Sequence, residues 1–278
     1  RLHDAARARI VEVASAMSGE EVPSNSLFVC IGGRYEYRNK GIDVFIDALD
    51  SINRSNYEGR SIQAFIMIPS GHHGPDRELL ARMAGNGENG YHTQVSHALM
   101  NPDYDAITGR LREVGLVNSV GDKVKVYFIP SYLNGDDGVF NMPYYDILCG
   151  MDLALFPSYY EPWGYTPLEA LAFRIPTLTT TLAGFGLWVK DHYKKEHPGV
   201  TVLERDDENY GDVVKGAAKR IEELALLDKV KRKEYRENAR EVARIALWDN
   251  QIVYYEEAYS IALAKIQGSL ASYKTKKK

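Results

Sequence analysis

Short apolar segments alternate with stretches of helical periodicity along most of this chain. The apolar segments have the length of buried strands, and Gly, Pro or polar residues bound them. They lie at 27–31, 64–68, 124–129, 153–156, 177–180 and 200–203, and helical patterns separate them at 41–52, 105–114, 144–151 and 168–173. Strands that alternate with helices form a parallel sheet covered on both faces. We therefore predict an α/β fold, a Rossmann-like doubly wound parallel sheet.

Three further segments flank or interrupt this alternation. Residues 2–17 carry apolar side chains at helical spacing and predict an opening helix, and 210–266 predicts two long helical stretches. Residues 70–102 are rich in Gly, His and Asn, and only 77–83 has a helical pattern, so we interpret this segment as an excursion on the strand ends. The basic run 274–278 is expected to be a solvated end.

Composition narrows the class of partner and the compartment. The formal charge of −4 over 278 residues argues against a nucleic-acid or anionic-membrane partner, since either favours a clear basic excess. Cys30 and Cys149 lie in apolar runs without a paired motif, which predicts free thiols in a reducing compartment. We find neither an apolar run of ~20 residues nor a signal peptide, and expect a soluble, cytoplasmic protein.

The loop after the first predicted strand carries two cations beside a helix start. It reads Gly-Gly-Arg-Tyr-Glu at 32–36 and Asn-Lys-Gly at 39–41. Arg34 and Lys40 near a helix N-terminus suit a diphosphate, and the structural alternative is a tight turn with two surface cations. The loop lacks G-x-G-x-x-G and the chain lacks a Walker lysine motif, which disfavours dinucleotide oxidoreductases and P-loop NTPases.

The loop after the fourth predicted strand carries two carboxylates eight positions apart, Glu161 and Glu169. Thr166 is predicted to cap the following helix, so the amides of 164–166 would face an anion over the helix start. A structural alternative exists for Glu169, because Thr-Pro-Leu-Glu fits a capping box closed on Thr166. Glu161 has no obvious structural role. Parallel sheets bind ligands at the carboxyl ends of their strands, so we expect both glutamates and both cations at one edge.

These motifs resemble those of a known family. The glutamate pair is similar to the E-x7-E element of retaining glycosyltransferases with the two-Rossmann-domain (GT-B) architecture. The motif Ser-Tyr-Tyr-Glu-Pro-Trp-Gly-Tyr-Thr-Pro at 158–167 is more specific and resembles that of the glycogen synthases of animals and fungi. The segments 33–36 and 39–41 resemble the same family, and the similarity extends from about residue 2 to residue 190.

The resemblance implies a role for each site residue. Arg34 and Lys40 would hold the diphosphate of a nucleotide-sugar, and Glu161 would face the transferred glucose, which makes these three the candidate catalytic residues. The remaining donor-binding candidates are Glu169 at the ribose, Tyr144 and the nearby Tyr132 at the base, and Gly33, Gly164, Tyr165 and Thr166 in the phosphate loops. The family likeness favours UDP-glucose, and such a site requires no metal and no cofactor.

The resemblance also implies a reaction and a domain plan. The expected reaction is retaining transfer of glucose to the non-reducing end of an α-1,4-glucan. Residues 1–20 would be a lead-in helix from an N-terminal domain outside this chain, 21–225 the nucleotide-sugar-binding domain, and 226–278 a helical segment. The acceptor glucan would bind through the N-terminal domain, so we expect this chain alone to transfer little or no glucose. Homo-oligomerisation of the longer protein stays open.

Two alternatives to this function remain open at the level of the sequence. One is another GT-B transferase, of the sucrose or trehalose type. The other is a non-catalytic module that binds a nucleotide-sugar without transferring it.

A stripe of arginines late in the chain is a candidate regulatory site. Arginine recurs every four residues, at Arg232, Arg236, Arg240 and Arg244. The glycogen synthases carry an arginine-rich helix near this position that binds glucose 6-phosphate, but these arginines do not match it one for one. Interleaved glutamates favour a solvated, internally neutralised face. We therefore expect a weak or absent phosphate-sugar sensor.

Other polar clusters have structural interpretations. Asp-Tyr-Asp at 103–105 has the form of a metal-binding motif, yet it stands at a predicted helix start, where acidic residues are favourable. His72, His73, His92 and His97 lack metal-ligand spacing and are interpreted as loop or surface histidines.

Overall fold

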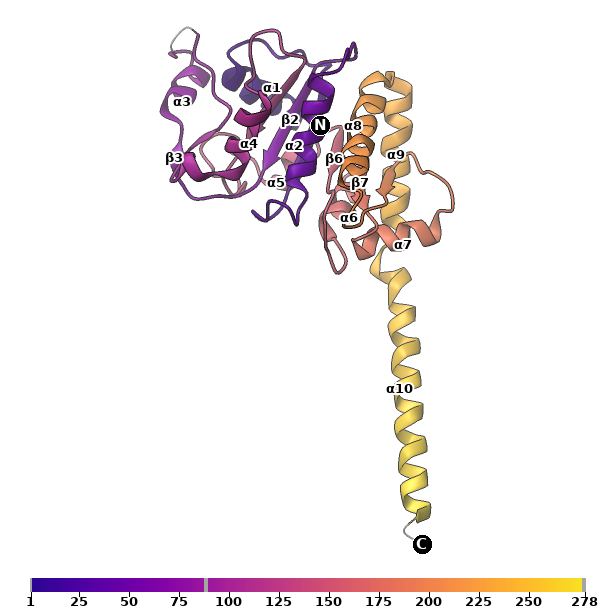
Figure 1. Cartoon of the computed structure of the whole chain (residues 1–278). Helices are drawn as coiled ribbons and strands as arrows, with labels where there is room; N and C mark the ends of the chain where they lie inside the picture. The colour runs from indigo at the N-terminus through magenta and orange to yellow at the C-terminus, as the bar shows by residue number, and fades with distance from the viewer. Residues whose placement is uncertain (1, 88–89, 277–278) are drawn as a thin grey trace.

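The computed structural model describes residues 2–87 and 90–276, with side chains as far as residue 267. A six-stranded sheet forms the centre of the molecule, as predicted (Figure 1). Its strands are β1 (Leu27–Gly32), β2 (Ile62–Met67), β5 (Val124–Phe128), β6 (Leu153–Leu155), β7 (Thr177–Thr180) and β8 (Val200–Leu203). Each coincides with one of the apolar segments of the sequence.

The strand order creates a switch point between β1 and β6. The order is β5-β2-β1-β6-β7-β8, and each neighbouring pair is parallel. The chain runs outward from β1 to β2 and β5, then returns to β6 on the other side of β1, where Val29 pairs with Leu153. The loops after β1 and β6 therefore leave the sheet side by side and diverge, which opens a crevice at their carboxyl ends.

The two faces of the sheet carry separate apolar layers. Leu27, Val29 and Ile31 of β1 pack with one set of helices, and Phe28 and Cys30 pack with the other, as the two-residue period of a strand requires. The first set is α2 (Ile42–Asn53), α4 (Ala106–Val114) and α8 (Tyr210–Leu226); the second includes α1 (Leu2–Ser18), α3 (Arg77–Met83) and α5 (Tyr144–Leu148).

The opening helix is an integral layer of this fold. Ile10, Val13 and Met17 of α1 are fully buried in the layer that also holds Phe28 of β1. The predicted division at residues 20 and 225 stays a prediction, but α1 is packed onto the sheet. Cys30 is buried, Cys149 is half-buried, and both are free thiols.

The C-terminal part contains three helices where two helical stretches were predicted. α9 (Lys229–Ile245) begins after a break at which Asp228 accepts a hydrogen bond from the Lys231 amide at 2.8 Å. α9 packs with α6 (Tyr165–Ala172) and α7 (Gly184–His192) in a third apolar cluster.

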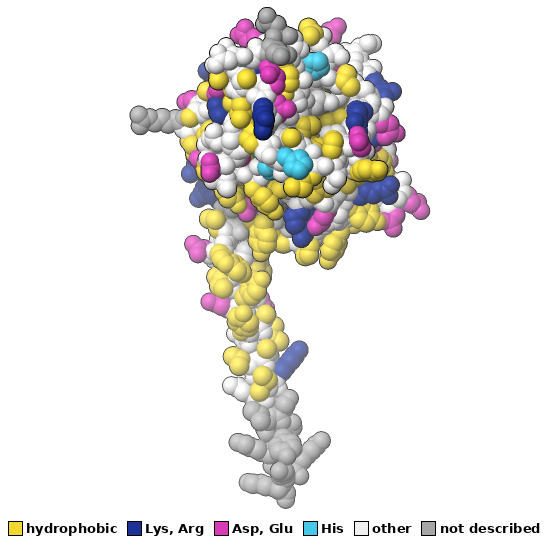
Figure 2. Space-filling view, turned by 90° about the vertical axis from the view of Figure 1, so that its left-hand side faces the viewer, with side chains coloured by type: hydrophobic (Ala, Val, Ile, Leu, Met, Phe, Trp, Pro, Cys, Tyr) yellow, Lys and Arg dark blue, Asp and Glu magenta, His cyan; other side chains and the backbone are white. Residues whose placement is uncertain are grey.

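The last helix, α10 (Trp248–Lys276), leaves the body of the molecule (Figure 1). Apolar side chains of this helix, such as Tyr259 and Leu263, are exposed. Figure 2 shows that yellow, hydrophobic side chains cover much of the helix below the body. In the part of the chain that the structure describes, no helix is both long enough and apolar enough to cross a membrane. The basic run at 274–278 lies outside the residues whose side chains are described.

The excursion at 70–102, expected on the strand ends, packs beside the end of the edge strand β5 and contains two strands that the sequence did not predict. β3 (His72–Pro75) and β4 (His97–Leu99) pair antiparallel, and a 3-10 turn (Pro102–Tyr104) leads into α4. The Ser96 amide donates to the Phe128 carbonyl of β5 at 3.0 Å. These strands are short and rich in His, Gly and Pro, so no apolar alternation marks them.

Candidate functional site

Lys40 and Glu161 meet at the switch point between β1 and β6. Lys40 ends the loop after β1, and Glu161 lies in the loop after β6, 121 positions later in the chain. The Lys40 ammonium forms an ion pair with Oε1 of Glu161, and their side chains are only 13% and 18% exposed. The predicted convergence of a cation and a carboxylate at this edge is therefore confirmed for this pair.

Close backbone contact holds the two loops together. The Tyr159 amide donates to the Asn39 carbonyl at 2.8 Å. Gly41 has a φ of +72°, and a Cβ there would lie 2.1 Å from the Pro157 carbonyl oxygen. Only glycine tolerates both that backbone conformation and that approach. Arg205, in the loop after β8, also donates a hydrogen bond to the Pro157 carbonyl.

The loop after β7 fixes the other side of Glu161. The Glu161 amide donates to the Leu182 carbonyl, and the Gly184 amide donates to the Glu161 carbonyl, both at 3.1 Å. Glu161 thus forms a short parallel bridge with Ala183 outside the main sheet. The backbone that carries the Glu161 carboxylate is therefore hydrogen-bonded to the loop after β7 through both its amide and its carbonyl.

Arg34 lies on the same loop as Lys40 but is mostly solvent-exposed. Its side chain is 79% exposed and pairs with Glu36 at 3.0 Å. Burial lowers the pKa of Lys40, Glu36 raises it, and the positive charge of Arg34 lowers it again. The contacting carboxylate of Glu161 favours the charged ammonium. Lys40 is therefore a sheltered cation of the site, and Arg34 is an exposed cation at its rim.

The helix after Glu161 begins earlier than predicted. α6 starts at Tyr165, and Gly164, with φ +101°, occupies the N-cap position without a side-chain cap. Thr166 is therefore inside the first turn, and the predicted Thr166 cap and its capping box with Glu169 are wrong. The left-handed conformation of Gly164 ends the preceding loop without a polar side chain. The amides of 164–166 still belong to the start of the helix, where the first amides have no partner within it.

Glu169 faces two tyrosines instead of the helix cap. Burial raises the pKa of Tyr144 well above its ordinary value, and the Glu169 charge adds to this shift. The pKa of Tyr145 is also raised, by burial first and then by Glu169. A Cβ at Gly32 would lie 2.7 Å from the Tyr144 hydroxyl oxygen. Glu169 and Tyr144 thus border the end of β1, on the same edge as Lys40.

The two candidate base-stacking aromatics lie on adjoining segments. The Leu133 carbonyl accepts a hydrogen bond from the Tyr144 amide at 2.8 Å, and Tyr132, one residue earlier, is 77% exposed. Gly33 lies against the Lys40 side chain, because a Cβ built on Gly33 would be 3.8 Å from the Lys40 Cδ. The roles in donor binding of all these residues stay predictions.

The arginine stripe of α9 does not form one cluster. Arg236 donates to the carbonyls of Met151 and Cys149 at 2.9 and 3.2 Å, and therefore ties α9 to the segment that leads from α5 into β6. Arg240 and Arg244 pair with glutamates three positions earlier on the same helix, at 3.6 and 3.2 Å. A glucose 6-phosphate site on this helix stays a prediction.

The other polar clusters have structural partners. Asp105 caps α4 by accepting from the Thr108 amide at 2.8 Å, which confirms the interpretation of 103–105 as helix-start charge. His97 is buried, contrary to the expectation of surface histidines, and its Nε2 lies 2.8 Å from the Asp137 carbonyl. Within the described ranges, no group of three or more His, Cys, Asp or Glu side chains is arranged to hold a metal ion.

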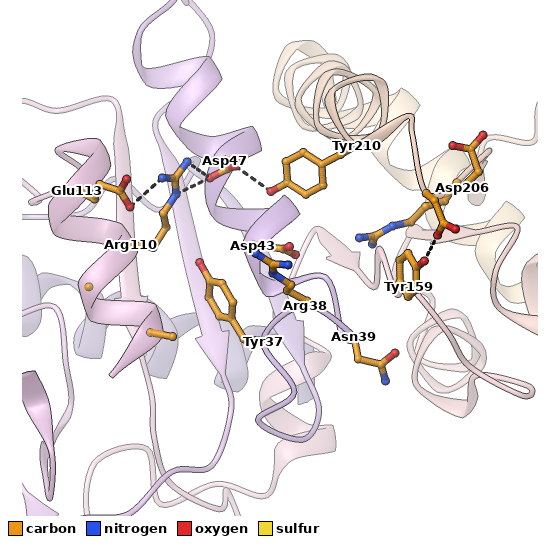
Figure 3. A pocket seen from close by; sticks show the side chains of 14 residues that line it. Tyr37, Arg38, Asn39, Asp43, Asp47, Arg110, Glu113, Tyr159, Asp206 and Tyr210 are labelled. Carbon is orange, nitrogen blue, oxygen red and sulfur yellow. Dashed lines mark hydrogen bonds and ion pairs between the residues drawn. The ribbon is translucent and has the colours of Figure 1, made fainter. Parts of the chain in front are cut away.

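Sequence reasoning missed a cleft of about 950 Å³ beside this site (Figure 3). Asn39 and Tyr159, which join the two loops, lie in its lining together with Arg205 and Tyr210. A signal existed, because the Glu-Arg-Asp-Asp at 204–207 directly follows the sixth predicted strand, where functional residues gather in such sheets.

Comparison with known proteins identifies the family. The sequence model described as glycogen synthase matches residues 79–277. This chain belongs to the glycogen synthase family. Curated members support the assignment: glycogen [starch] synthase isoform 2 of Saccharomyces cerevisiae is 26% identical over 307 aligned residues, which cover 87% of this chain and 43% of that protein. The liver glycogen [starch] synthase of Mus musculus is 29% identical and covers 60% of this chain and 31% of its own length.

The chain spans less than half the length of these relatives. Glycogen [starch] synthase of Neurospora crassa gives the same picture, with 26% identity over 87% of this chain and 42% of that protein. Among solved structures, WaaG, a glycosyltransferase involved in lipopolysaccharide biosynthesis, aligns with 83% of this chain and 49% of its own, with a TM-score of 0.41 and 17% identity.

Proposed function

We propose that this chain is the donor-binding half of a retaining glucosyltransferase of the glycogen synthase type. It binds UDP-glucose at the switch point between β1 and β6, and glucose passes to the non-reducing end of an α-1,4-glucan held by a further domain. The observation that carries the proposal is the sheltered Lys40–Glu161 pair, formed across 121 positions in a chain of this family.

The chemistry of the transfer suits these side chains. Breaking the bond between glucose and the diphosphate develops negative charge on the leaving group and positive charge on the anomeric carbon. Lys40, Arg34 and the amides at the start of α6 are placed to stabilise the first charge. Glu161 is placed to stabilise the second. Lys40 and Glu161 are sheltered and paired in the structure, so little reorganisation of these two side chains is needed.

The charges of Lys40 and Glu161 neutralise each other in the structure. Lys40 contacts Glu161, and a bound diphosphate would offer Lys40 a second anionic partner. Lys40 would then lie between the diphosphate and the carboxylate, with the sugar close to Glu161. Glu169, next to Tyr144, is available to the ribose hydroxyls, and Tyr144 and Tyr132 to the base.

Calorimetric titration of the chain with UDP and with ADP tests the proposal. We expect UDP to bind and ADP to bind at least about tenfold more weakly, with UDP binding lost in Lys40→Met. Lys215→Met is the matched control, because Lys215 is an exposed lysine on α8 that pairs with Asp212 of the same helix. Equal affinities for UDP and ADP would contradict the donor assignment, and full UDP affinity in Lys40→Met would contradict the site.

Activity is tested in a longer protein that includes the acceptor domain. Glu161→Ala is expected to abolish glucose transfer while UDP still binds. Retained transfer in a folded Glu161→Ala protein would contradict the catalytic role. Nucleotide binding with no transfer in the unsubstituted longer protein would instead favour a non-catalytic module.

A further inference from the structure

The cleft beside the Lys40–Glu161 pair is built from segments that are far apart in the sequence. Its walls come from the loop before α2, from α2 and α4, and from the loops that follow β6 and β8 (Figure 3). Its volume of about 950 Å³ lies at the upper end of the range of small-molecule sites, roughly 300–1,000 Å³. Lys40 and Glu161 are not among its lining residues, although their neighbours Asn39 and Tyr159 are, so the cleft lies next to the proposed donor site and is distinct from it.

Three tyrosines line this cleft from three separate segments. Tyr37 precedes α2, Tyr159 follows β6, and Tyr210 is the first residue of α8. Tyr159 and Tyr210 are 41% and 37% exposed, and Tyr37 is half-buried. Such rings offer a flat apolar face with a polar edge, which suits a ligand with one apolar and one hydroxylated side.

The polar groups of the cleft are held in place by one another. Asp47 of α2 accepts from Arg110 of α4 at 2.9 Å through one carboxylate oxygen and from the Tyr210 hydroxyl at 2.8 Å through the other (Figure 3). The Tyr159 hydroxyl donates to Asp207. These bonds join α2, α4 and α8 across the groove, so the walls are pre-organised and binding loses little side-chain entropy.

A buried cation and a half-buried carboxylate complete the lining. Arg205 is 6% exposed, donates to the Pro157 carbonyl, and lies over the Tyr159 ring at 5.3 Å. Asp43 uses one carboxylate oxygen to accept from the Val44 amide at 2.8 Å. Burial raises the pKa of Asp43, against the effect of the Arg205 charge.

The charges of the lining decide the class of ligand. Carboxylates outnumber guanidinium groups by five to three, which disfavours a phosphate or another anion. Several of these charges are already paired inside the wall, which disfavours a simple cation. Mixed donors and acceptors around aromatic faces suit a neutral polyhydroxylated molecule, because its hydroxyl groups both donate and accept.

We propose that this cleft binds a neutral oligosaccharide, with sugar rings against Tyr37, Tyr159 and Tyr210 and hydroxyl groups bonded to Asp43 and Arg205. The choice of an α-1,4-glucan as its ligand rests on the proposed function. The Asn39–Tyr159 contact makes the wall of this cleft continuous with the loops that carry Lys40 and Glu161. A glucan chain in the cleft would therefore lie beside the proposed site of transfer.

Calorimetric titration of the chain with maltoheptaose, an α-1,4-linked glucose oligomer, tests this inference. We expect binding that weakens at least about tenfold in Tyr210→Ala and several-fold in Asp43→Asn. Tyr259→Ala is the matched control, since Tyr259 is an exposed tyrosine on α10, outside the cleft. Urea unfolding of each variant separates lost binding from lost folding, and Asp43→Asn preserves the side-chain shape if Tyr210→Ala is destabilised.

The outcomes separate this inference from the proposed function. No maltoheptaose binding, or binding unchanged by both cleft variants, would overturn the oligosaccharide site, and UDP titration of the same samples shows whether the donor site stands independently. Equal binding of cellohexaose, a β-1,4-linked glucose oligomer, would support an oligosaccharide cleft but contradict the choice of an α-1,4-glucan as its ligand. Binding of glucose 6-phosphate that competes with maltoheptaose and is lost in Tyr210→Ala would overturn the neutral class of ligand.

Discussion

Replacing Glu161 by Gln is expected to tighten UDP binding while it destabilises the fold. In the free chain, the Glu161 carboxylate neutralises Lys40 and repels an incoming diphosphate. A carboxylate and a phosphate charge separated by ~6 Å, at an effective dielectric constant of ~20, repel by about 3 kcal/mol. Salt and residual water reduce this to ~1 kcal/mol, which corresponds to about fivefold tighter binding.

The cost to stability comes from the same ion pair. Its side chains are 13% and 18% exposed, so the pair is neither fully buried nor a surface pair. Loss of the charged partner of Lys40 should lower the free energy of unfolding by ~1–2 kcal/mol, between the values for exposed and buried pairs.

The assay combines urea unfolding with UDP calorimetry at low and physiological salt. The matched control is Glu237→Gln, which removes the same charge from an exposed carboxylate that pairs with Arg174 and Arg240. It should change stability by less than ~0.5 kcal/mol and leave UDP affinity unchanged. Weaker UDP binding in Glu161→Gln with unaltered stability would refute the view that Glu161 competes with the diphosphate for Lys40.

Three further predictions follow from single contacts. Gly41→Ala should destabilise the chain by ~2–4 kcal/mol in urea unfolding and abolish UDP binding, because a Cβ would force the two loops apart, whereas Gly211→Ala, with open space around it, should be neutral or stabilising. Burial lowers the pKa of His97 below 6.5, so the unfolded chain binds more protons there; stability should fall as pH drops from about 6.5 through the lowered pKa, and His97→Asn should flatten that slope. Arg236→Ala should lower the free energy of unfolding by ~1–3 kcal/mol without changing glucose 6-phosphate calorimetry, whereas Arg240→Ala should change it by less than ~0.5 kcal/mol. Millimolar glucose 6-phosphate binding that disappears when Arg236→Ala and Arg240→Ala are combined would contradict this.

The sheet was predictable because its signals are local. Each buried strand is a short apolar run, so Leu27–Gly32 and Leu153–Leu155 were both located from sequence. The alternation of these strands with helices predicted a parallel sheet. The sequence predicted two helical stretches over 210–266, whereas the structure has three helices, so one of the two breaks, after α8 or after α9, escaped prediction. β3 and β4 escaped because their pairing depends on contacts with the β5 edge.

The site was predictable only in part, for reasons of geometry. Motifs located Lys40 and Glu161, and the carboxyl-edge rule for parallel sheets predicted that they would meet. The cap of α6 was assigned wrongly, because Thr166 is the better capping residue by type, but the positive φ of Gly164 starts the helix earlier. The oligosaccharide cleft depends on how α2, α4 and α8 lie side by side, which no local pattern in the sequence records.

A crystal structure of this chain with UDP-glucose tests the central claim most directly. The account predicts the diphosphate within hydrogen-bonding distance of the Lys40 ammonium, the glucose next to the Glu161 carboxylate, and the ribose facing Glu169. A nucleotide bound at another edge of the sheet, or in the cleft lined by Tyr37 and Tyr210, would contradict it.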